Sequence, residues 1–177
     1  FLSAIRRAKA DSRIEHLLLE VSFGLLSWPK AEELRSALGD FKTSGKPVVA
    51  YMEYAGNVEY LLASVADEVY LHPQGILDVR GLQAEAVFLR GSLDLLGIEP
   101  EFEQIGRYKN APDTFTRKTM SEGQREVLTS IVDDLYGRFV DSVAEGRELD
   151  RDRVMQILDN GPYRAEAALE AGLADGL

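Results

Sequence analysis

The sequence predicts an α/β protein with a mostly parallel sheet, and three observations support that class. Short apolar runs of strand length alternate along the chain with longer segments whose apolar residues recur at helical spacing. The run at residues 14–22 has a continuous apolar centre, which is typical of a strand buried on both faces of a parallel sheet. The 177 residues, 45% of them hydrophobic, suit one globular domain. We therefore expect residues 1–177 to form a single domain.

The first half of the chain predicts three helices and four strands. Apolar residues at three- and four-residue spacing mark the helices, and the third helix is rich in small apolar residues, which indicates burial. These helices are expected at residues 2–10, 30–42 and 58–66. Turn residues such as Gly45-Lys46-Pro47 and His72-Pro73-Gln74-Gly75 bound the strands. The strands are expected at residues 14–22, 48–52, 68–71 and 76–79.

The second half predicts four helices and one strand. A helix at 83–96 is expected to end at Gly97, and an apolar strand is expected at 99–105. Ser121 and Gln124 have the spacing of a capping box, which begins a long helix. That helix is expected to reach about residue 145, with an apolar stripe at Val127, Ile131, Leu135, Phe139 and Val143. Two short helices close the chain at residues 151–158 and 165–171.

Composition excludes several kinds of site. The formal net charge of -10 argues against nucleic-acid binding, and the absence of cysteine excludes disulfides, thiolate zinc sites and a Cys nucleophile. His16 and His72 lie in different strand regions, so we expect no metal site, and we expect no cofactor. There is neither a Gly-x-Ser-x-Gly elbow nor a Gly-rich phosphate loop. No apolar run approaches the roughly 18 residues of a transmembrane helix. The chain starts at Phe1, so we expect it to be part of a longer protein.

Lys109 is the main candidate for a catalytic residue. It follows the predicted strand at 99–105, directly after Gly-Arg-Tyr, and precedes a turn at Pro112. Most lysines are solvated, and that interpretation stays open here. A lysine amine acts as a general base only when it is neutral, and burial or a neighbouring cation favours the neutral form. Such a base needs a serine hydroxyl within hydrogen-bond reach and backbone N–H groups for the oxyanion.

Four stretches, in this order and spacing, form a specific pattern. They are Ser44-Gly45-Lys46-Pro47-Val48-Val49-Ala50, residues 60–75, Gly106-Arg107-Tyr108-Lys109-Asn110-Ala111, and Phe115-Thr116-Arg117 with Met120-Ser121 and Arg125-Glu126. Together they resemble the signal peptide peptidase A (protease IV) family, and specifically the amino-terminal half of its long form. The resemblance runs over nearly all of the chain.

The resemblance implies a Clp protease/crotonase-like superhelix of ββα units and a Ser–Lys serine peptidase that degrades cleaved signal peptides. The family's catalytic lysine falls on Lys109. The long forms of the family resemble a duplication. Their amino-terminal half supplies the catalytic lysine, and their carboxy-terminal half supplies the serine. The resemblance further implies an apolar signal peptide substrate, a homo-oligomer, and membrane association on the periplasmic or extracytoplasmic side.

Two departures from the family pattern concern the serine and the oxyanion hole. Counting back from Tyr60 places Asn57 where short forms carry the serine, so this chain has no nucleophile of its own. The loop that resembles the oxyanion loop is Phe23-Gly24-Leu25, in which only Gly24 is a glycine. Ser64 and Ser121 are interpreted as packing and capping residues rather than nucleophiles.

Two other functions remain open. The domain is a catalytically silent scaffold or peptide-binding part of the same assembly if Lys109→Ala leaves the intact enzyme fully active. It is a crotonase-like acyl-CoA enzyme if it binds coenzyme A, which we do not expect. The loop at residues 23–28 is apolar and suits either a peptide groove or a subunit contact.

Overall fold

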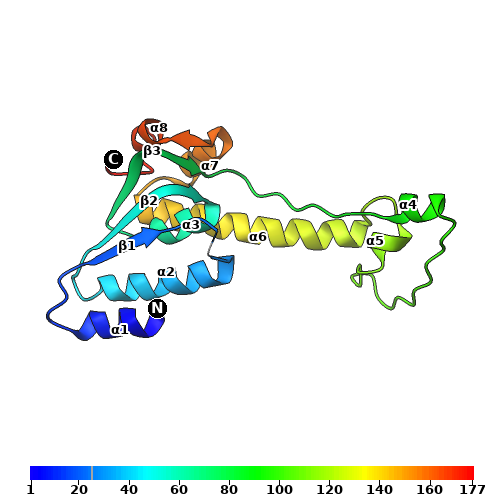
Figure 1. Ribbon diagram of the computed structural model, residues 1–177, viewed down its shortest axis with the longest axis horizontal. Coiled ribbons are helices and arrows are strands. Elements are labelled where there is room, and N and C mark those ends of the chain that lie inside the picture. The colour runs from blue at the N-terminus through cyan, green and yellow to red at the C-terminus, as the bar shows by residue number, and fades with distance from the viewer. Residues whose placement is uncertain (25) are drawn as a thin grey trace. The chain divides into compact units, whose positions relative to one another are not determined.

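The computed structural model describes residues 1–24 and 26–177, which form two compact units. One unit comprises residues 1–81 and 138–177, and the other comprises residues 82–137. Figure 1 shows the elements of both. The strands are β1 (Leu17–Val21), β2 (Val48–Gly56), β3 (Glu68–Asp78) and β4 (Tyr163–Arg164). The helices are α1 (Leu2–Ala10), α2 (Trp28–Lys42), α3 (Asn57–Ala63), α4 (Arg90–Leu95), α5 (Asp113–Thr116), α6 (Glu122–Arg147), α7 (Arg151–Asn160) and α8 (Ala165–Glu170).

The sheet has the order β1-β2-β3-β4, with β1, β2 and β3 parallel and β4 antiparallel to β3. Helices α2 and α3 make the two crossovers between the parallel strands, as such pairing requires. Helix α1 packs on α2, α2 on α3, and α8 on β3 (Figure 1). The predicted α/β class with a mostly parallel sheet is confirmed.

The two strands predicted at residues 68–71 and 76–79 are parts of one strand, β3. Its pairing with β2 passes from Met52↔Leu71 to Tyr54↔Ile76, so the predicted turn is a bulge within the ladder. A Cβ on Gly75 would lie 2.6 Å from the carbonyl oxygen of Glu53, which explains a glycine in that bulge. The register then resumes, and β2 continues to Gly56.

The hydrophobic core lies in the unit formed by residues 1–81 and 138–177. Its largest fully buried side chains include Tyr60, Phe41, Phe139, Leu38, Met52 and Leu61. The Tyr60 hydroxyl donates to the carbonyl oxygen of Leu173 at 2.8 Å, and burial raises the pKa of Tyr60. Tyr60 thereby ties α3 to the chain's last turn.

Two predicted elements are wrong in part. Residues 99–105 form no strand, and only residues 90–95 of the predicted helix at 83–96 are helical. A strand needs a neighbour for its backbone groups, and residues 82–137 contain no other strand. The long helix is confirmed as α6, but its apolar stripe is buried only towards its end, since Val127 and Ile131 are exposed and Phe139 and Val143 are buried.

The carboxy-terminal tail is fastened by Asp175. Its carboxylate accepts two hydrogen bonds from the Arg147 guanidinium, at 2.7 and 2.9 Å, and one from the N–H of Val69 at 2.7 Å. Burial opposes ionisation of Asp175, but the hydrogen bonds from Arg147 and Val69 outweigh it and lower the pKa of Asp175. The carboxylate therefore stabilises the fold most at pH values at which it is fully ionised in both the folded and the unfolded chain.

We predict that Asp175→Asn lowers the free energy of unfolding at pH 7 by about 1 kcal/mol, because Arg147 loses its charged partner. The lowered pKa means that this contribution is present above the ordinary carboxyl pKa and is lost as the pH falls below about 4. Thermal unfolding measured across pH tests this. The control is Asp159→Asn at an exposed position, which should not lower the stability. A difference between wild type and D175N that stays constant down to pH about 2 would contradict the prediction.

Candidate active site

Lys109 lies in the unit of residues 82–137, on an exposed turn that precedes α5. Residues 99–105, directly before this turn, form no strand, so the expected position at a strand end is wrong. Its side chain is exposed, so the described residues do not supply the burial that favours a neutral amine. The turn itself is well defined, because it is anchored on both sides of the lysine.

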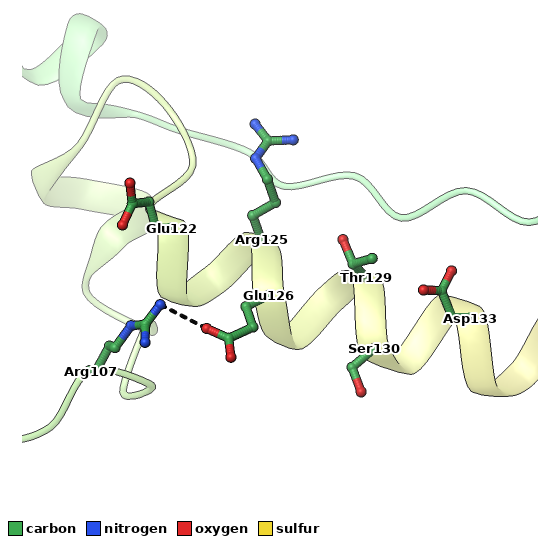
Figure 2. A pocket seen from close by; sticks show the side chains of 7 residues that line it. All are labelled: Arg107, Glu122, Arg125, Glu126, Thr129, Ser130 and Asp133. Atoms are coloured by element: carbon green, nitrogen blue, oxygen red, sulfur yellow. Dashed lines mark ion pairs between the residues drawn. The ribbon is translucent and has the colours of Figure 1, made fainter.

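The anchor before Lys109 is Glu126 of α6. The Arg107 guanidinium pairs with the Glu126 carboxylate at 2.8 Å, which Figure 2 shows as a dashed line, and the Tyr108 hydroxyl donates to the same carboxylate at 3.2 Å. Close approach of the backbone adds to this, because a Cβ on Gly123 would lie 2.6 Å from the Arg107 carbonyl oxygen. Two of the residues of the Gly-Arg-Tyr-Lys motif thus serve to hold the turn against α6.

The backbone of Lys109 is also held directly. Its N–H donates to the carbonyl oxygen of Gly106 at 3.3 Å, and its own carbonyl oxygen accepts from the Gln104 amide at 2.6 Å. Gly106 has a φ of 104°, a conformation that explains the glycine at the start of this turn. The main chain at Lys109 is therefore fixed while the side chain is accessible.

The anchor after Lys109 is a polar cluster of Asn110, Asp113 and Ser121. The Ser121 hydroxyl donates to the Asp113 carboxylate at 2.7 Å, and the Asn110 amide lies 3.3 Å from that carboxylate and 3.2 Å from the Ser121 oxygen. Asp113 is only 4% exposed. The predicted cap is confirmed, because the Gln124 N–H donates to the Ser121 oxygen at 3.2 Å. The reciprocal half of the box does not form, since the Gln124 Oε1 atom is buried without a partner among the described residues.

Hollows lie beside the anchored turn rather than around the lysine. One of about 630 Å³ is lined by Arg107 and by the outer face of α6 (Figure 2). A second, of about 460 Å³, is lined by the Asn110–Asp113–Ser121 cluster and its neighbours, including Arg117. Phe115, from the same motif region, stacks on Phe102 with ring centroids 5.8 Å apart. Lys109 lines neither hollow.

Asn57, which the count along the sequence predicts to stand in place of the family's serine, is the first residue of α3 and has a structural role. Its amide nitrogen donates to the Arg80 carbonyl oxygen at 2.8 Å, and its amide oxygen accepts from the Arg80 N–H at 2.9 Å. An asparagine makes both bonds because it carries a donor and an acceptor side by side. Asn57 thus fastens the chain where it leaves β3.

The N–H of Gly24, the predicted oxyanion donor, is engaged by Glu59. Glu59 is 4% exposed, and its two carboxylate oxygens accept from the N–H groups of Gly24 at 2.9 Å and of Gly56 at 3.1 Å. Gly24 has a φ of 81°, and its neighbour Leu25, part of the same predicted loop, lies outside the described residues. In this structure the Gly24 N–H is therefore already used by a carboxylate of the chain itself.

Sequence reasoning missed Glu59, Asp113 and Glu126 as residues that organise these loops. Glu59 had a readable signal, because it is the third residue of a helix that begins directly after Gly56, as in a capping box. Glu126 belongs to one of the stretches that carry the family resemblance, but its partners Arg107 and Tyr108 depend on how the turn folds back on α6. Asp113 had no signal beyond its charge.

We predict that Asn57→Ser does not convert this chain into a peptidase. The new hydroxyl lacks an N–H pair for the oxyanion at Gly24, and Arg80 loses both hydrogen bonds, which lowers the free energy of unfolding by about 1–2 kcal/mol. Hydrolysis of a fluorogenic peptide and thermal unfolding measure the two effects. Asn57→Ala is the matched control, with the same loss of stability and no hydroxyl. Turnover by N57S, absent from N57A, would show that Gly24 and Glu59 do not block the site.

Residues 1–24 and 26–177 contain no group of three or more His, Asp or Glu side chains placed to hold a metal ion. His72 accepts a hydrogen bond from the Gln74 N–H at 3.1 Å. Among the helices described, none has the length and apolar character needed to cross a membrane.

Comparisons with known proteins give the family. The model of peptidase family S49 matches residues 40–177. The chain is 35% identical over 167 residues to "Serine protease SPPA, chloroplastic" of Arabidopsis thaliana, covering 94% of this chain and 25% of that protein. It is 33% identical over 153 residues to "Protease 4" of Haemophilus influenzae (86% and 25% covered) and 30% identical over 185 residues to "Protease 4" of Salmonella typhi (99% and 30% covered). It thus spans about a quarter of the length of these relatives.

Solved structures agree on the fold. A crystal structure titled only as that of an enzyme matches with a TM-score of 0.59 at 11% identity, over 99% of this chain and 86% of the other. A peptidase from Plasmodium falciparum matches with a TM-score of 0.53 at 9% identity, over the same shares of both chains. Since the family model also covers most of its length, this chain belongs to peptidase family S49, whose fold is of the Clp protease/crotonase type.

Proposed function

We propose that this chain is one half of a serine endopeptidase that degrades cleaved signal peptides, in which Lys109 is the general base for a serine from a partner. The observation that carries the proposal is an exposed lysine on an anchored turn, in a chain that has Asn57 where the family's serine falls. An asparagine amide is not a nucleophile of this kind, so the serine has to come from the carboxy-terminal half or a neighbouring subunit.

The reaction is an acyl transfer. The partner's serine oxygen attacks the peptide carbonyl carbon while its proton passes to the Lys109 amine, and the carbonyl becomes an oxyanion. The tetrahedral intermediate then collapses, the C–N bond breaks, and the same proton passes from Lys109 to the leaving amine. Lys109 next takes a proton from a water molecule, which attacks the acyl-serine and releases the carboxylic acid. The proton returns to the serine oxygen, and the base is neutral again.

The surface of residues 82–137 supports a partner. None of the buried hydrophobic side chains lies among these residues, all of which are described. Large apolar side chains are exposed instead, including Leu95 at 90%, Leu96 at 71% and Ile105 at 89%. Exposed apolar side chains in a segment that buries none of its own support an interaction site here. A homo-oligomer, or the serine-bearing half, would cover it and supply the burial that Lys109 lacks.

The substrate and location follow from the same family relationship. An apolar signal peptide suits apolar side chains such as Phe23, which is 59% exposed and packs edge-on against Tyr54 with centroids 4.7 Å apart. A peptidase acting on such peptides works at a membrane, on the periplasmic or extracytoplasmic side. The same exposed ring suits a subunit contact, so the surface supports assembly as well as peptide binding.

A second candidate is a catalytically silent scaffold of the same assembly. The contact that favours it is Glu59, which holds the Gly24 N–H that an oxyanion would need. This contact concerns only the part of the site around Asn57 and leaves the role of Lys109 untouched. We therefore place the scaffold function second.

Reconstitution from separate halves tests the proposal. This chain and the serine-bearing half are purified separately, and the hydrolysis of an apolar fluorogenic peptide is measured for each alone and for the mixture. We expect turnover only in the mixture. Full activity of the serine-bearing half alone would overturn the split site, and turnover by this chain alone would show a nucleophile that we have not assigned.

A further inference from the structure

We propose that Asp113 is a positioning residue for the reaction, which orients the Lys109 turn through Ser121 and Asn110. The inference rests on the proposed role of Lys109 and goes beyond it, since Asp113 belongs to neither the Ser–Lys pair nor the oxyanion hole. Asp113 is the only carboxylate among residues 82–137 that is buried, at 4% exposure. Burying a carboxylate costs free energy unless it is hydrogen-bonded. The hydrogen bonds of Asp113 are therefore needed to keep it in this position.

The hydrogen bonds of the Asn110–Asp113–Ser121 cluster have a defined order of donors and acceptors. The Ser121 hydroxyl has one proton, and it donates that proton to Asp113 at 2.7 Å. The oxygen lone pairs then face the Gln124 N–H and the Asn110 amide, both about 3.2 Å away. Asp113 therefore fixes the rotation of the hydroxyl, and the hydroxyl together with the carboxylate fixes the Asn110 side chain.

Asn110 transmits this order to the lysine because it is the next residue in the chain. Its amide nitrogen has three acceptors within 3.3 Å, of which two are Asp113 and Ser121 and the third is the Arg107 carbonyl oxygen of the turn itself. Without the carboxylate, the turn is held mainly from the other side, by Glu126. A base that is misplaced by about 1 Å costs up to about 100-fold in rate.

The test uses the intact enzyme that contains this chain. We expect Asp113→Asn to lower kcat by about 10- to 100-fold with KM changed less than about twofold, because the base is displaced and peptide binding is not. Asp94→Asn is the matched control, since Asp94 is an exposed carboxylate of the same unit that pairs with Arg90 and Lys118. It should leave kcat unchanged.

A double-mutant cycle separates positioning from folding. In a Lys109→Ala background, measured by single turnover, Asp113→Asn should cause no further loss, since the base on which it acts is gone. The same 10- to 100-fold factor in both backgrounds, or an unchanged kcat in D113N, would overturn the inference. High activity of K109A itself would instead overturn the proposed function, so the two failures are distinguishable.

Ser121 provides a second route if D113N does not fold. Ser121→Thr keeps the hydroxyl that donates to Asp113 and caps α6, whereas Ser121→Ala removes it. We expect kcat to fall in S121A and to return to near the wild-type value in S121T, with KM little changed in both. Equal kcat values for the two variants would overturn the inference.

Discussion

Replacing Lys109 by alanine in the intact enzyme is expected to lower kcat by about 1,000-fold, within the range of a lost general base. The serine hydroxyl is a poor nucleophile without a group that accepts its proton, and no other residue replaces the amine at this turn. Lys109→Arg should be as inactive, because a guanidinium keeps its charge and cannot accept the proton. Hydrolysis of an apolar fluorogenic peptide at saturating substrate measures kcat directly.

Lys118 is the control for this experiment. It belongs to the same unit, its side chain is 66% exposed, and it pairs with Asp94 at 2.7 Å. Lys118→Ala therefore removes a lysine and its positive charge without touching the anchored turn, and activity should be unchanged. Full activity in K109A would instead establish the scaffold function, in which this chain shapes the assembly without taking part in the chemistry.

The second large effect concerns stability and falls on Gly146. Helix α6 passes the end of α3 so closely that a Cβ on Gly146 would overlap the carbonyl oxygen of Ser64. Arg35 occupies the same contact, with its guanidinium donating to Ser64 Oγ at 2.9 Å and to the Ser142 carbonyl oxygen at 2.8 Å. Gly146→Ala has to push the helices apart, and we expect it to destabilise the fold by about 3 kcal/mol.

Gly39 provides the matched control, because it is also a helical glycine of the same unit. A Cβ there would lie 4.0 Å from the nearest side-chain atom, of Val65, which is an ordinary contact. Gly39→Ala should stabilise α2 by about 0.5–1 kcal/mol. Thermal unfolding followed by circular dichroism should place G146A roughly 10 °C below wild type and G39A slightly above it. A melting temperature of G146A equal to that of wild type would show that α6 and α3 do not touch at this point.

Local sequence patterns predicted those elements whose partners lie nearby. The strands β1 and β2 with the helix between them were expected from apolar runs and turn residues, and they form one parallel pair. The strand predicted at residues 99–105 is wrong because its apolar pattern has no pairing strand among the described residues, and its Ile105 is 89% exposed. An apolar run indicates burial, but not whether the burying surface belongs to the same chain.

The candidate site shows the same limit in its chemistry. The sequence pattern predicted Lys109 as the candidate base, and a count along the chain predicted that Asn57 stands in place of the serine. The hydrogen bonds of Asn57 to Arg80, 23 residues away, follow from the fold and not from any local motif. Asp113 is a charged residue of ordinary appearance in the sequence, and only its burial and its hydrogen bonds reveal that it organises a loop.

Residues 82–137 carry the lysine and yet bury no hydrophobic side chain. If a partner covers this surface, burying these exposed side chains and completing the site are one event. If the proposed function holds, Lys109 would then act as a base only after assembly, and the unassembled chain would cleave no peptide even where its synthesis outpaces assembly.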